Sequence, residues 1–363
     1  NSVASGSVTS NYRVSFSSMI ADGEIWCSQM TSYEQNADFF TFGVTTDRQV
    51  VIGKPKIQTT IKNVTKGTSY TATGINRAPA NNTLTVFNNR LNDSNYVNTD
   101  AYEVVLQTSD NRIMNGGTLT GTVKAIYTAG TTSRGKLDSN TVVITARGSK
   151  ISTISGKFAV GNTVTISTSI YDSYGNNDKW AKVDEAIGGQ CLVMKNGSIN
   201  NDLSGGSSDN YPTNIIGYKS DKTIMMSMVT ADTNGVRKGL VFNSNIDTFC
   251  KAVGYDTCLL LDGGGSTTMI TLEDGNYVER ACYSDGAIRA TWNSCAIVYD
   301  AGNLVVPNNI KNVVFDPEYY YAKNKDLQAF GQNSSRLFQH FYEFGIAEGR
   351  QGSPLFAIDE YIN

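Results

Sequence analysis

Apolar and polar residues alternate along most of the first 150 residues, which is the pattern of half-buried β-strands. Six stretches alternate in this way or are rich in β-branched residues, with Asn, Gly, Asp and Ser between them: YRVSFSSMI (12–20), QVVIGK (49–54), TLTVFN (83–88), AYEVVLQT (101–108), GTVKAIYT (121–128) and NTVVITA (140–146). TVTISTSIYD, Thr163 to Asp172, continues the pattern. The first half of the chain is therefore predicted to be β-structure.

The pattern changes near Lys179. KWAKVDEAIGG, Lys179 to Gly189, is predicted to be a short helix that ends at its two glycines. QCLVMKNGSI (190–199) predicts a strand followed by a tight turn at Asn196-Gly197. KTIMMSMVTAD (222–232) predicts a strongly apolar strand.

A second helix is predicted before the apolar strand LLL (259–261). It ends at Gly254, and its apolar positions recur near helical spacing: Leu240, Ile246, Phe249, Cys250 and Val253. TTMITLEDGNYVER (267–280) predicts a hairpin with Asp274-Gly275 at the turn, and CAIVYD (295–300) predicts a final buried strand. The fold class predicted is α+β, with mixed, mostly antiparallel β-sheets and a few packed helices.

The end of the chain predicts a small α-helical C-terminal module at 313–363, after a linker at 301–312. Asp316 is an N-cap residue followed by proline at the first helical position. Ser334 or Ser335 is predicted to cap a helix that ends at Gly345 and places four apolar residues on one face: Leu337, Phe338, Phe341 and Phe344. We expect this module to serve surface attachment or self-association, with His340 in a structural role.

Composition narrows the function classes. Charged residues are 17% of the chain, and the polar character comes from Asn, Ser, Thr and Gly, as on exported proteins that face carbohydrate. The net charge of −3 and the lack of a basic run argue against nucleic-acid binding. No apolar window is long enough for a transmembrane helix. NSVASGSVTS has no signal-peptide pattern, so we expect a secreted or cell-surface protein in its mature form.

The six cysteines form no CxxC motif, and His340 is the single histidine, so a zinc site is not expected. Their even number allows up to three disulfides. We predict at least one, and buried thiols are the alternative. The many carboxylates are compatible with Ca²⁺, but no EF-hand spacing is present, so no metal and no cofactor are predicted.

LLLDGGGSTTM (259–269) carries the strongest chemical signal. It lacks the lysine of a P-loop, does not open a helix as a dinucleotide fingerprint does, and does not fit the GxSxG spacing. One interpretation is a glycine-rich turn without chemistry. The other is a concave nest of backbone N–H groups that faces an anion, beside Asp262 and three hydroxyl groups: Ser266, Thr267 and Thr268.

This stretch resembles the hallmark of the phosphodiester glycosidase family. Other blocks resemble that family in the same order: NADFFTFG (36–43), NRAPANNTLTVFN (76–88), VDEAIGGQCLVMKNG (183–197), TADTNGVRKGL (230–240) and YVERACYSDGAIRATWNSCAIVYD (277–300). The resemblance implies a catalytic domain at 27–300, preceded by an N-terminal β segment or linker at 1–26. One position departs from the pattern, because Thr213 stands where the family usually has an arginine.

The resemblance implies hydrolysis of the glycosidic bond of a sugar-1-phosphodiester in a surface or extracellular glycan. The catalytic candidates are carboxylates: Asp262, Asp232 and Glu185. The substrate-binding candidates supply amides, hydroxyls and charges: Asn36, Gly263, Gly264, Gly265, Ser266, Thr267, Asp285, Arg289 and Asn293. For Asp262 the alternative role is to cap the turn through its own side chain.

Two other interpretations stay open. The chain could be a catalytically inactive surface protein of the same fold that binds glycans or self-assembles, which the missing arginine favours. It could also act on glycans without phosphate, as an ordinary glycosidase or lyase does.

Overall fold

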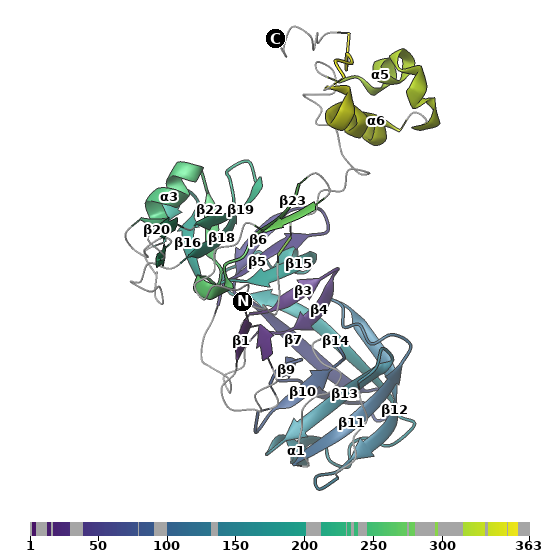
Figure 1. Ribbon diagram of the computed structural model, residues 1–363. Coiled ribbons are helices and arrows are strands. Elements are labelled where there is room, and N and C mark those ends of the chain that lie inside the picture. The colour runs from purple at the N-terminus through teal and green to yellow at the C-terminus, as the bar shows by residue number, and fades with distance from the viewer. Residues whose placement is uncertain are drawn as a thin grey trace. The chain divides into compact units, whose positions relative to one another are not determined.

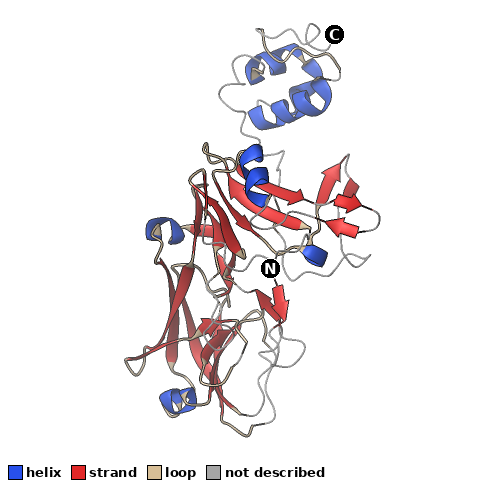
Figure 2. Cartoon of the chain, turned by 90° about the vertical axis from the view of Figure 1, so that its left-hand side faces the viewer, coloured by secondary structure: helices blue, strands red, loops and turns tan. Residues whose placement is uncertain are grey.

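The computed structural model describes residues 2–4, 13–15, 17–29, 39–78, 80–90, 100–131, 137–200, 212–229, 231–233, 236–238, 245–273, 276–279, 295–296, 315–330, 333–346 and 348–354. The chain forms two compact units, 1–294 and 295–363 (Figure 1). Strands dominate the first unit and helices the second (Figure 2). The predicted linker at 301–312 lies outside the described residues, so the domain boundaries drawn from the sequence stay predictions.

The largest sheet of the first unit has eight strands (Figure 1). Their order across the sheet is β8 (Thr68–Thr71), β7 (Pro55–Asn63), β14 (Thr163–Asp172), β12 (Thr118–Tyr127), β11 (Ala101–Thr108), β13 (Thr141–Arg147), β10 (Leu84–Phe87) and β9 (Gly74–Ile75). Neighbouring strands are antiparallel except β9 and β10. The mixed, mostly antiparallel sheets that the alternating pattern predicts are therefore confirmed.

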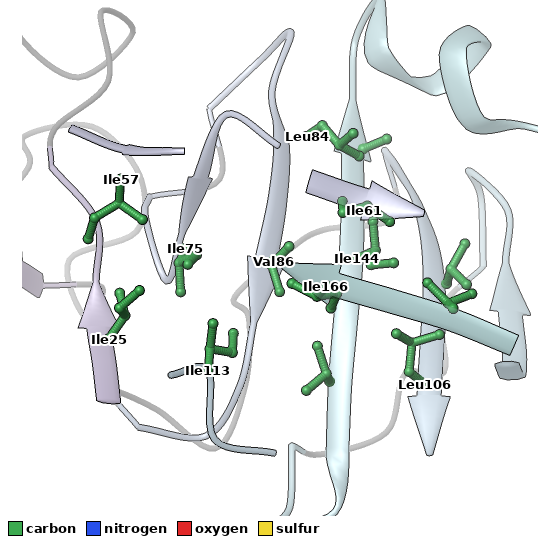
Figure 3. Packing of buried hydrophobic residues seen from close by; sticks show 14 of the residues in the cluster. Ile25, Ile57, Ile61, Ile75, Leu84, Val86, Leu106, Ile113, Ile144 and Ile166 are labelled. Atoms are coloured by element: carbon green, nitrogen blue, oxygen red, sulfur yellow. The ribbon is translucent and has the colours of Figure 1, made fainter. Parts of the chain in front are cut away.

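Every second residue of β7 is buried, because successive side chains of a strand point to opposite faces of the sheet. Across the strands of this sheet, buried aliphatic side chains pack into one core (Figure 3): Ile57, Ile61, Ile75, Leu84, Val86, Leu106, Ile144 and Ile166. Ile25 and Ile113, from outside this sheet, belong to the same core. The helix α1 (Lys150–Ile154) buries Ile154 there.

Two five-stranded sheets complete the main framework of the first unit. One has the order β4 (Glu24–Cys27), β3 (Met19–Ala21), β15 (Val183–Gly188), β5 (Thr41–Thr45) and β6 (Val50–Gly53). The other has the order β17 (Ser198–Ile199), β16 (Cys191–Lys195), β22 (Thr257–Leu260), β18 (Thr213–Tyr218) and β19 (Ile224–Val229). Three strand pairs are separate: β1 (Ser2–Ala4) with β2 (Arg13–Ser15), β20 (Ala231–Thr233) with β21 (Val236–Lys238), and β23 (Ile270–Glu273) with β24 (Asn276–Glu279).

The two five-stranded sheets share an apolar core. Phe42 and Val50 from the first sheet pack with side chains of the second: Leu192, Ile216 and Leu259. Backbone hydrogen bonds continue the contact, because the Gly189 N–H donates to Phe40 O (2.7 Å) and the Gln190 N–H donates to Leu260 O (2.7 Å). These contacts fix the end of β22, where the glycine loop begins.

The helix predicted at Lys179–Gly189 is wrong. Only α2 (Asn177–Trp180) is helical, and Val183–Gly188 forms β15 between β3 and β5. Pairing with two strands outweighs the weak helical pattern of a short apolar run. Gly188 does not stop a helix: an added Cβ would lie 2.1 Å from the Cβ of Ser17, so the glycine allows a close approach.

Several turns agree with the sequence. Asn196 and Gly197 both have positive φ (51° and 73°), as the predicted two-residue hairpin turn between β16 and β17 requires. The helix α3 (Ile246–Val253) ends at Gly254, whose φ is 90°. β23 pairs with β24 from Ile270 to Glu279, as the predicted hairpin requires. The strand predicted at 295–300 is not seen at Cys295 and Ala296, which are exposed and outside any strand, and its other residues lie outside the described ranges.

The second unit contains α5 (Pro317–Lys323), the 3-10 helix η3 (Lys325–Phe330), α6 (Ser334–His340) and the π-helical turn η4 (Phe341–Gly345). The carboxylate of Asp316 accepts from the N–H groups of Glu318 and Tyr319, which confirms the predicted N-cap. An aromatic and aliphatic core holds the helices together: Phe315, Tyr320, Leu327, Leu337 and Phe341.

Two details of the second unit differ from the prediction. The N-cap of α6 is Asn333, whose Oδ1 accepts from the Arg336 N–H, rather than Ser334 or Ser335. Phe344 does not share the buried face, since it is 53% exposed. The Ile346 N–H donates to Phe341 O, a π-type bond five residues apart that changes the helical period over the last turn.

A buried carboxylate joins the first five-stranded sheet to β14. Asp172, 1% exposed, accepts from the indole N–H of Trp180 (2.8 Å) and from the backbone N–H groups of Lys54 (3.2 Å) and Tyr174 (2.9 Å). A Cβ added to Gly53 would lie 1.8 Å from the Asp172 carboxylate, so only glycine fits beside it. Three N–H groups therefore depend on one buried side chain.

Replacing Asp172 by alanine is expected to lower the free energy of unfolding of the first unit by about 3 kcal/mol, because buried donors lose their acceptor. Urea unfolding followed by tryptophan fluorescence measures it. Asp178→Ala, at an exposed residue of α2, is the control and should change the free energy by less than about 0.5 kcal/mol. Equal losses in the two variants would contradict the role of Asp172.

Candidate functional site

The candidate site begins at the end of β22, which lies between β16 and β18. The strand is covered on both faces: Cys258 belongs to the apolar cluster with α3, and Leu259 to the cluster shared with the other five-stranded sheet. This double burial explains its continuous apolar run. Asp262, Gly263 and Gly264 are half-buried, so the loop emerges from a rigid strand.

The glycine loop is tied to the protein by its own backbone. The Gly263 N–H donates to Asp262 Oδ1 (3.0 Å), and the Gly264 N–H donates to Pro212 O (2.8 Å). The next turn, η1 (Gly264–Ser266), closes with bonds from the Ser266 N–H to Gly263 O and from the Thr267 N–H to Gly264 O. The predicted open nest is therefore wrong for these four amides, because each already donates within the chain.

Two of the three glycines have identifiable structural reasons. A Cβ added to Gly263 would lie 2.5 Å from Pro212 O, so the loop can approach β18 only without a side chain there. Gly264 has φ of +58°, which favours glycine, and open space around its Cα. The loop thus needs glycine once for a close approach and once for its backbone conformation.

Asn214 is a loop-positioning residue that the sequence analysis did not single out. Its Nδ2 donates to Asp262 O (2.8 Å) and to Thr267 Oγ1 (3.3 Å), and its backbone O accepts from the Leu261 N–H (2.9 Å). Asn214 on β18 therefore holds both ends of the loop. Its only sequence signal is a polar side chain at the start of the apolar strand TNIIGY.

The three hydroxyl groups after the glycines have different surroundings. Thr267 is fully buried and its Oγ1 accepts from Asn214, so it faces the protein. Thr268 Oγ1 is buried without a hydrogen-bond partner. Ser266 is half-buried. Thr268, which lies in direct continuation of the loop, thus has a hydroxyl that is enclosed by the protein and makes no hydrogen bond.

The position at which the family pattern has an arginine lies beside the loop. Thr213 follows Pro212, whose carbonyl receives the Gly264 N–H, and its own side chain is buried. The departure from the pattern therefore falls at the candidate site and not at a remote surface.

The other predicted site residues are not brought to the loop by any contact that the structure describes. Glu185 is exposed on β15, and its Oε1 accepts from the Asp22 N–H (3.0 Å) at the β3–β4 turn. Asp232 lies in the β20–β21 pair opposite Arg237, and its side chain is not described. The remaining candidates lie outside the described residues: Asn36, Asp285, Arg289 and Asn293. Their roles stay predictions.

The cysteines that the structure describes form no disulfide. Cys27, Cys191, Cys250 and Cys258 are buried thiols, Cys295 is exposed, and Cys282 lies outside the described residues. Behind the site, the Cys258 thiol donates to Cys250 Sγ at 3.7 Å, which joins β22 to α3. This hydrogen bond and burial raise the pKa of the Cys258 thiol far above its ordinary value, and burial raises the pKa of Cys191 to about 12.

Raised pKa values keep these thiols protonated, so we expect them to resist iodoacetamide in the folded protein at pH 8. Mass spectrometry of peptides from native and urea-unfolded protein measures this, with exposed Cys295 as the internal reference. Cys191 and Cys258 should be alkylated only after unfolding, and so should Cys250, because its sulfur is buried. A Cys250–Cys258 disulfide, or labelling of Cys258 in the native protein, would contradict the expectation.

In the part of the chain that the structure describes, no three or more His, Cys, Asp and Glu side chains are grouped closely enough to hold a metal ion. Over the same residues, no helix has both the length and the apolar character needed to span a membrane.

Comparison with solved structures supports the fold. A hypothetical protein from Synechocystis has 15% identity and a TM-score of 0.54, over 73% of this chain and 46% of that one. A Burkholderia pseudomallei protein described as exported has 11% identity and a TM-score of 0.52, over 77% of this chain and 60% of that one. The match thus spans about half of the length of these chains, and at such identities the likeness shows the fold alone.

A search of curated proteins found no significant match. The family model of the phosphodiester glycosidases matches residues 114–298. The blocks at 36–43 and 76–88 precede the matched residues and remain a resemblance. Since the match runs over half of the 363-residue chain and includes Asp262 with its glycine loop, the protein belongs to the phosphodiester glycosidase family.

Proposed function

We propose that this protein is a hydrolase that cleaves the bond between an anomeric carbon and the oxygen of a phosphodiester in a surface or extracellular glycan. The observation that carries the proposal is the position of Asp262, a half-buried carboxylate at the end of a rigid central strand, inside the residues matched by the family model. A secreted or cell-surface location fits this substrate, and one structural relative is described as exported.

The chemistry needs fewer protein groups than ordinary glycoside hydrolysis. A phosphate monoester is already a good leaving group, so no carboxylic acid with a raised pKa is needed to protonate it. One carboxylate is then sufficient. Asp262 would activate the attacking water or stabilise the positive charge that develops on the sugar ring.

The anionic leaving group needs hydrogen-bond donors other than the amides of Gly263 and Gly264, because these already donate to Asp262 and Pro212. We assign this role to the hydroxyl of Ser266, which is half-buried, and to Arg289, whose guanidinium can bind a phosphate in a bidentate manner. The structure around Arg289 is not described, so its assignment is based on the sequence.

The direct test is incubation of the chain with an aryl sugar-1-phosphodiester and with the matching aryl glycoside that lacks phosphate. Release of free reducing sugar from the diester alone is the expected result. Release from the phosphate-free glycoside instead would indicate an ordinary glycosidase and would contradict the proposal.

A second candidate function is a glycan-binding surface protein that has lost the chemistry. The buried Thr213 at the arginine position and the occupied amides of the loop favour it. Two exposed aromatic side chains on the second unit, Tyr342 (64%) and Phe344 (53%), are compatible with self-association or surface attachment through residues 313–363. Binding on a glycan array without turnover of any diester would support this alternative.

A further inference from the structure

A cluster of charged side chains in the first unit takes no part in the candidate site. It consists of two ion pairs: Glu24 with Arg90, and Asp110 with Arg112. Glu24 is the first residue of β4, Arg90 lies shortly after β10, and the second pair follows β11. We call this cluster of four side chains the double ion-pair site.

The first ion pair is almost buried and has hydrogen-bonding groups to spare. Arg90 Nε donates to Glu24 Oε1 at 2.6 Å, and the Glu24 side chain is 7% exposed. Asn88 Nδ2 lies 3.5 Å from the same oxygen. Among the described residues, nothing bonds to Glu24 Oε2 or to the Nη groups of Arg90, whose side chain is 28% exposed. An acceptor and several donors are therefore available side by side.

Hydrogen bonds hold the three segments of the site together. Asn88 Nδ2 donates to Asn111 O (3.0 Å) and Asn111 Nδ2 donates to Asn89 Oδ1 (2.9 Å), which ties the segment after β10 to the segment after β11. The Ile25 N–H donates to Ile113 O (2.8 Å), which ties β4 to the segment after β11 as well. Asn88 and Asn111 are buried. The charged groups are therefore carried by a fixed main chain, which lowers the entropy cost of binding a ligand.

The second ion pair forms the exposed rim of the site. Arg112 donates to the Asp110 carboxylate from its Nε (2.8 Å) and from its backbone N–H (3.0 Å), and the two side chains are 50% and 49% exposed. These bonds lower the pKa of Asp110, and the charge of Arg90 lowers it further. The bond to Asp110 raises the pKa of Arg112, and the charge of Glu24 adds to this increase. The two ion pairs are thus close enough to act on each other.

The charges of the double ion-pair site balance, and this balance decides the class of ligand. Two carboxylates and two guanidinium groups sum to zero, so a ligand with a net charge of either sign gains little. Hydroxyl groups suit the site better, because each of them both donates and accepts. One hydroxyl of a sugar ring can accept from an Nη group of Arg90 while the neighbouring hydroxyl donates to Glu24 Oε2. Hydrogen bonds of this kind, with one charged partner, are stronger than those between neutral groups.

We propose that the double ion-pair site binds an uncharged saccharide through neighbouring hydroxyl groups of one sugar ring. The site goes beyond the proposed function, since it contains no residue of the glycine loop and its binding requires no turnover. In a chain that acts on a surface glycan, it would hold the polymer by its sugar units, while the candidate site would act on the phosphodiester.

Calorimetry with the full chain tests the proposal. The probes are three uncharged trisaccharides, built of glucose, of galactose and of mannose, and the fully O-methylated form of each, which accepts hydrogen bonds but cannot donate them. The first variant is Arg90→Lys, which keeps the positive charge beside Glu24 but lacks the forked Nη donors. The second is Arg112→Met, at the exposed rim. Arg147→Lys, at another arginine paired with a carboxylate, is the matched control.

We expect at least one free trisaccharide to bind, at least about tenfold more weakly to Arg90→Lys and at least about threefold more weakly to Arg112→Met. Its methylated form should bind at least about tenfold more weakly to the unmodified chain, and Arg147→Lys should bind as the unmodified chain does. Turnover of an aryl sugar-1-phosphodiester should stay within about twofold in both variants, and their melting temperatures within about 2 °C. If Arg90→Lys melts earlier than this, the result with Arg112→Met decides.

Three results would overturn the site: no binding of any trisaccharide by the unmodified chain, undiminished binding by the folded variants, or undiminished binding of the methylated probe. If no diester is turned over but a trisaccharide still binds through Arg90 and Arg112, the proposed function fails and the double ion-pair site stands. Turnover without any binding of trisaccharides gives the opposite outcome.

Discussion

Replacement of Asp262 by asparagine is expected to lower kcat/KM for an aryl sugar-1-phosphodiester at least about 10³-fold, equivalent to about 4 kcal/mol of transition-state stabilisation. Asparagine keeps an Oδ1 that accepts from the Gly263 N–H, so the turn that Asp262 caps should persist. What is lost is the negative charge, which water activation or stabilisation of the cationic sugar requires. Steady-state kinetics measures the catalytic role of the Asp262 charge, and the melting temperature measures its structural role in capping the turn.

Asp221→Asn is the matched control for this substitution. Asp221 lies in the turn between β18 and β19, which belong to the same sheet as β22. Its Oδ1 accepts from the Thr223 N–H, so its side chain also caps a turn. That control should leave kcat/KM within twofold. If Asp262→Asn were equally harmless, Asp262 would be a turn residue only, and the parallel variants Glu185→Gln and Asp232→Asn would then test the other two carboxylates.

The sequence predicts the local structure well where one signal decides it. Asn196-Gly197 is a hairpin turn because both residues adopt positive φ, and Gly254 ends α3 for the same reason. The start of α5 depends only on the side chain of Asp316, which caps the helix, and on the ring of Pro317 at the first helical position. Such features depend on neighbours in sequence, and they require no knowledge of the rest of the fold.

The prediction fails where distant segments decide the outcome. Val183–Gly188 becomes a strand because β3 and β5 lie on either side of it, and neither partner is visible from the local pattern. Phe344 points to another face than predicted because the Ile346 N–H donates to Phe341 O, five residues earlier. A prediction that assumes a uniform α-helical period does not include such a bond.

The candidate site shows the same division. Asp262 and the three glycines stand out in the sequence because their combination is rare after an apolar strand. The bonds that close the loop come from Pro212 and Asn214 on β18, about 50 residues earlier in the chain. The sequence does not show whether a backbone N–H group already donates a hydrogen bond within the chain. The sequence could therefore suggest a nest of N–H groups, but it could not show that these groups are already bonded.

The hydrogen bonds that the loop amides make within the chain change the interpretation of the glycine loop. The sequence suggests that bare backbone amides serve the ligand directly. In the structure, the amides of Gly263 and Gly264 position Asp262 instead, since one closes the turn around its carboxylate and the other anchors that turn to β18. The glycines would then contribute to catalysis through geometry, and their substitution should act through the placement of Asp262.

Gly263→Ala tests this role. The added Cβ would lie 2.5 Å from Pro212 O, a backbone atom that cannot rotate away, so the loop must move off β18. We expect a loss of about 2 kcal/mol in unfolding free energy from the overlap. Displacement of the carboxylate by roughly 1 Å should lower kcat/KM about 10²-fold. Urea unfolding and steady-state kinetics on the same preparation measure both effects.

Gly264→Ala is the matched control, because it places the same methyl group one residue later. Its Cβ would meet no atom within 4 Å, and the cost is the backbone strain of an alanine at φ of +58°, about 1 kcal/mol. Activity should therefore fall much less than in Gly263→Ala. Equal losses in the two variants would mean that contact with Pro212 does not fix the loop, and the placement of Asp262 would then depend on other contacts, such as the bond from Asn214 Nδ2 to Asp262 O.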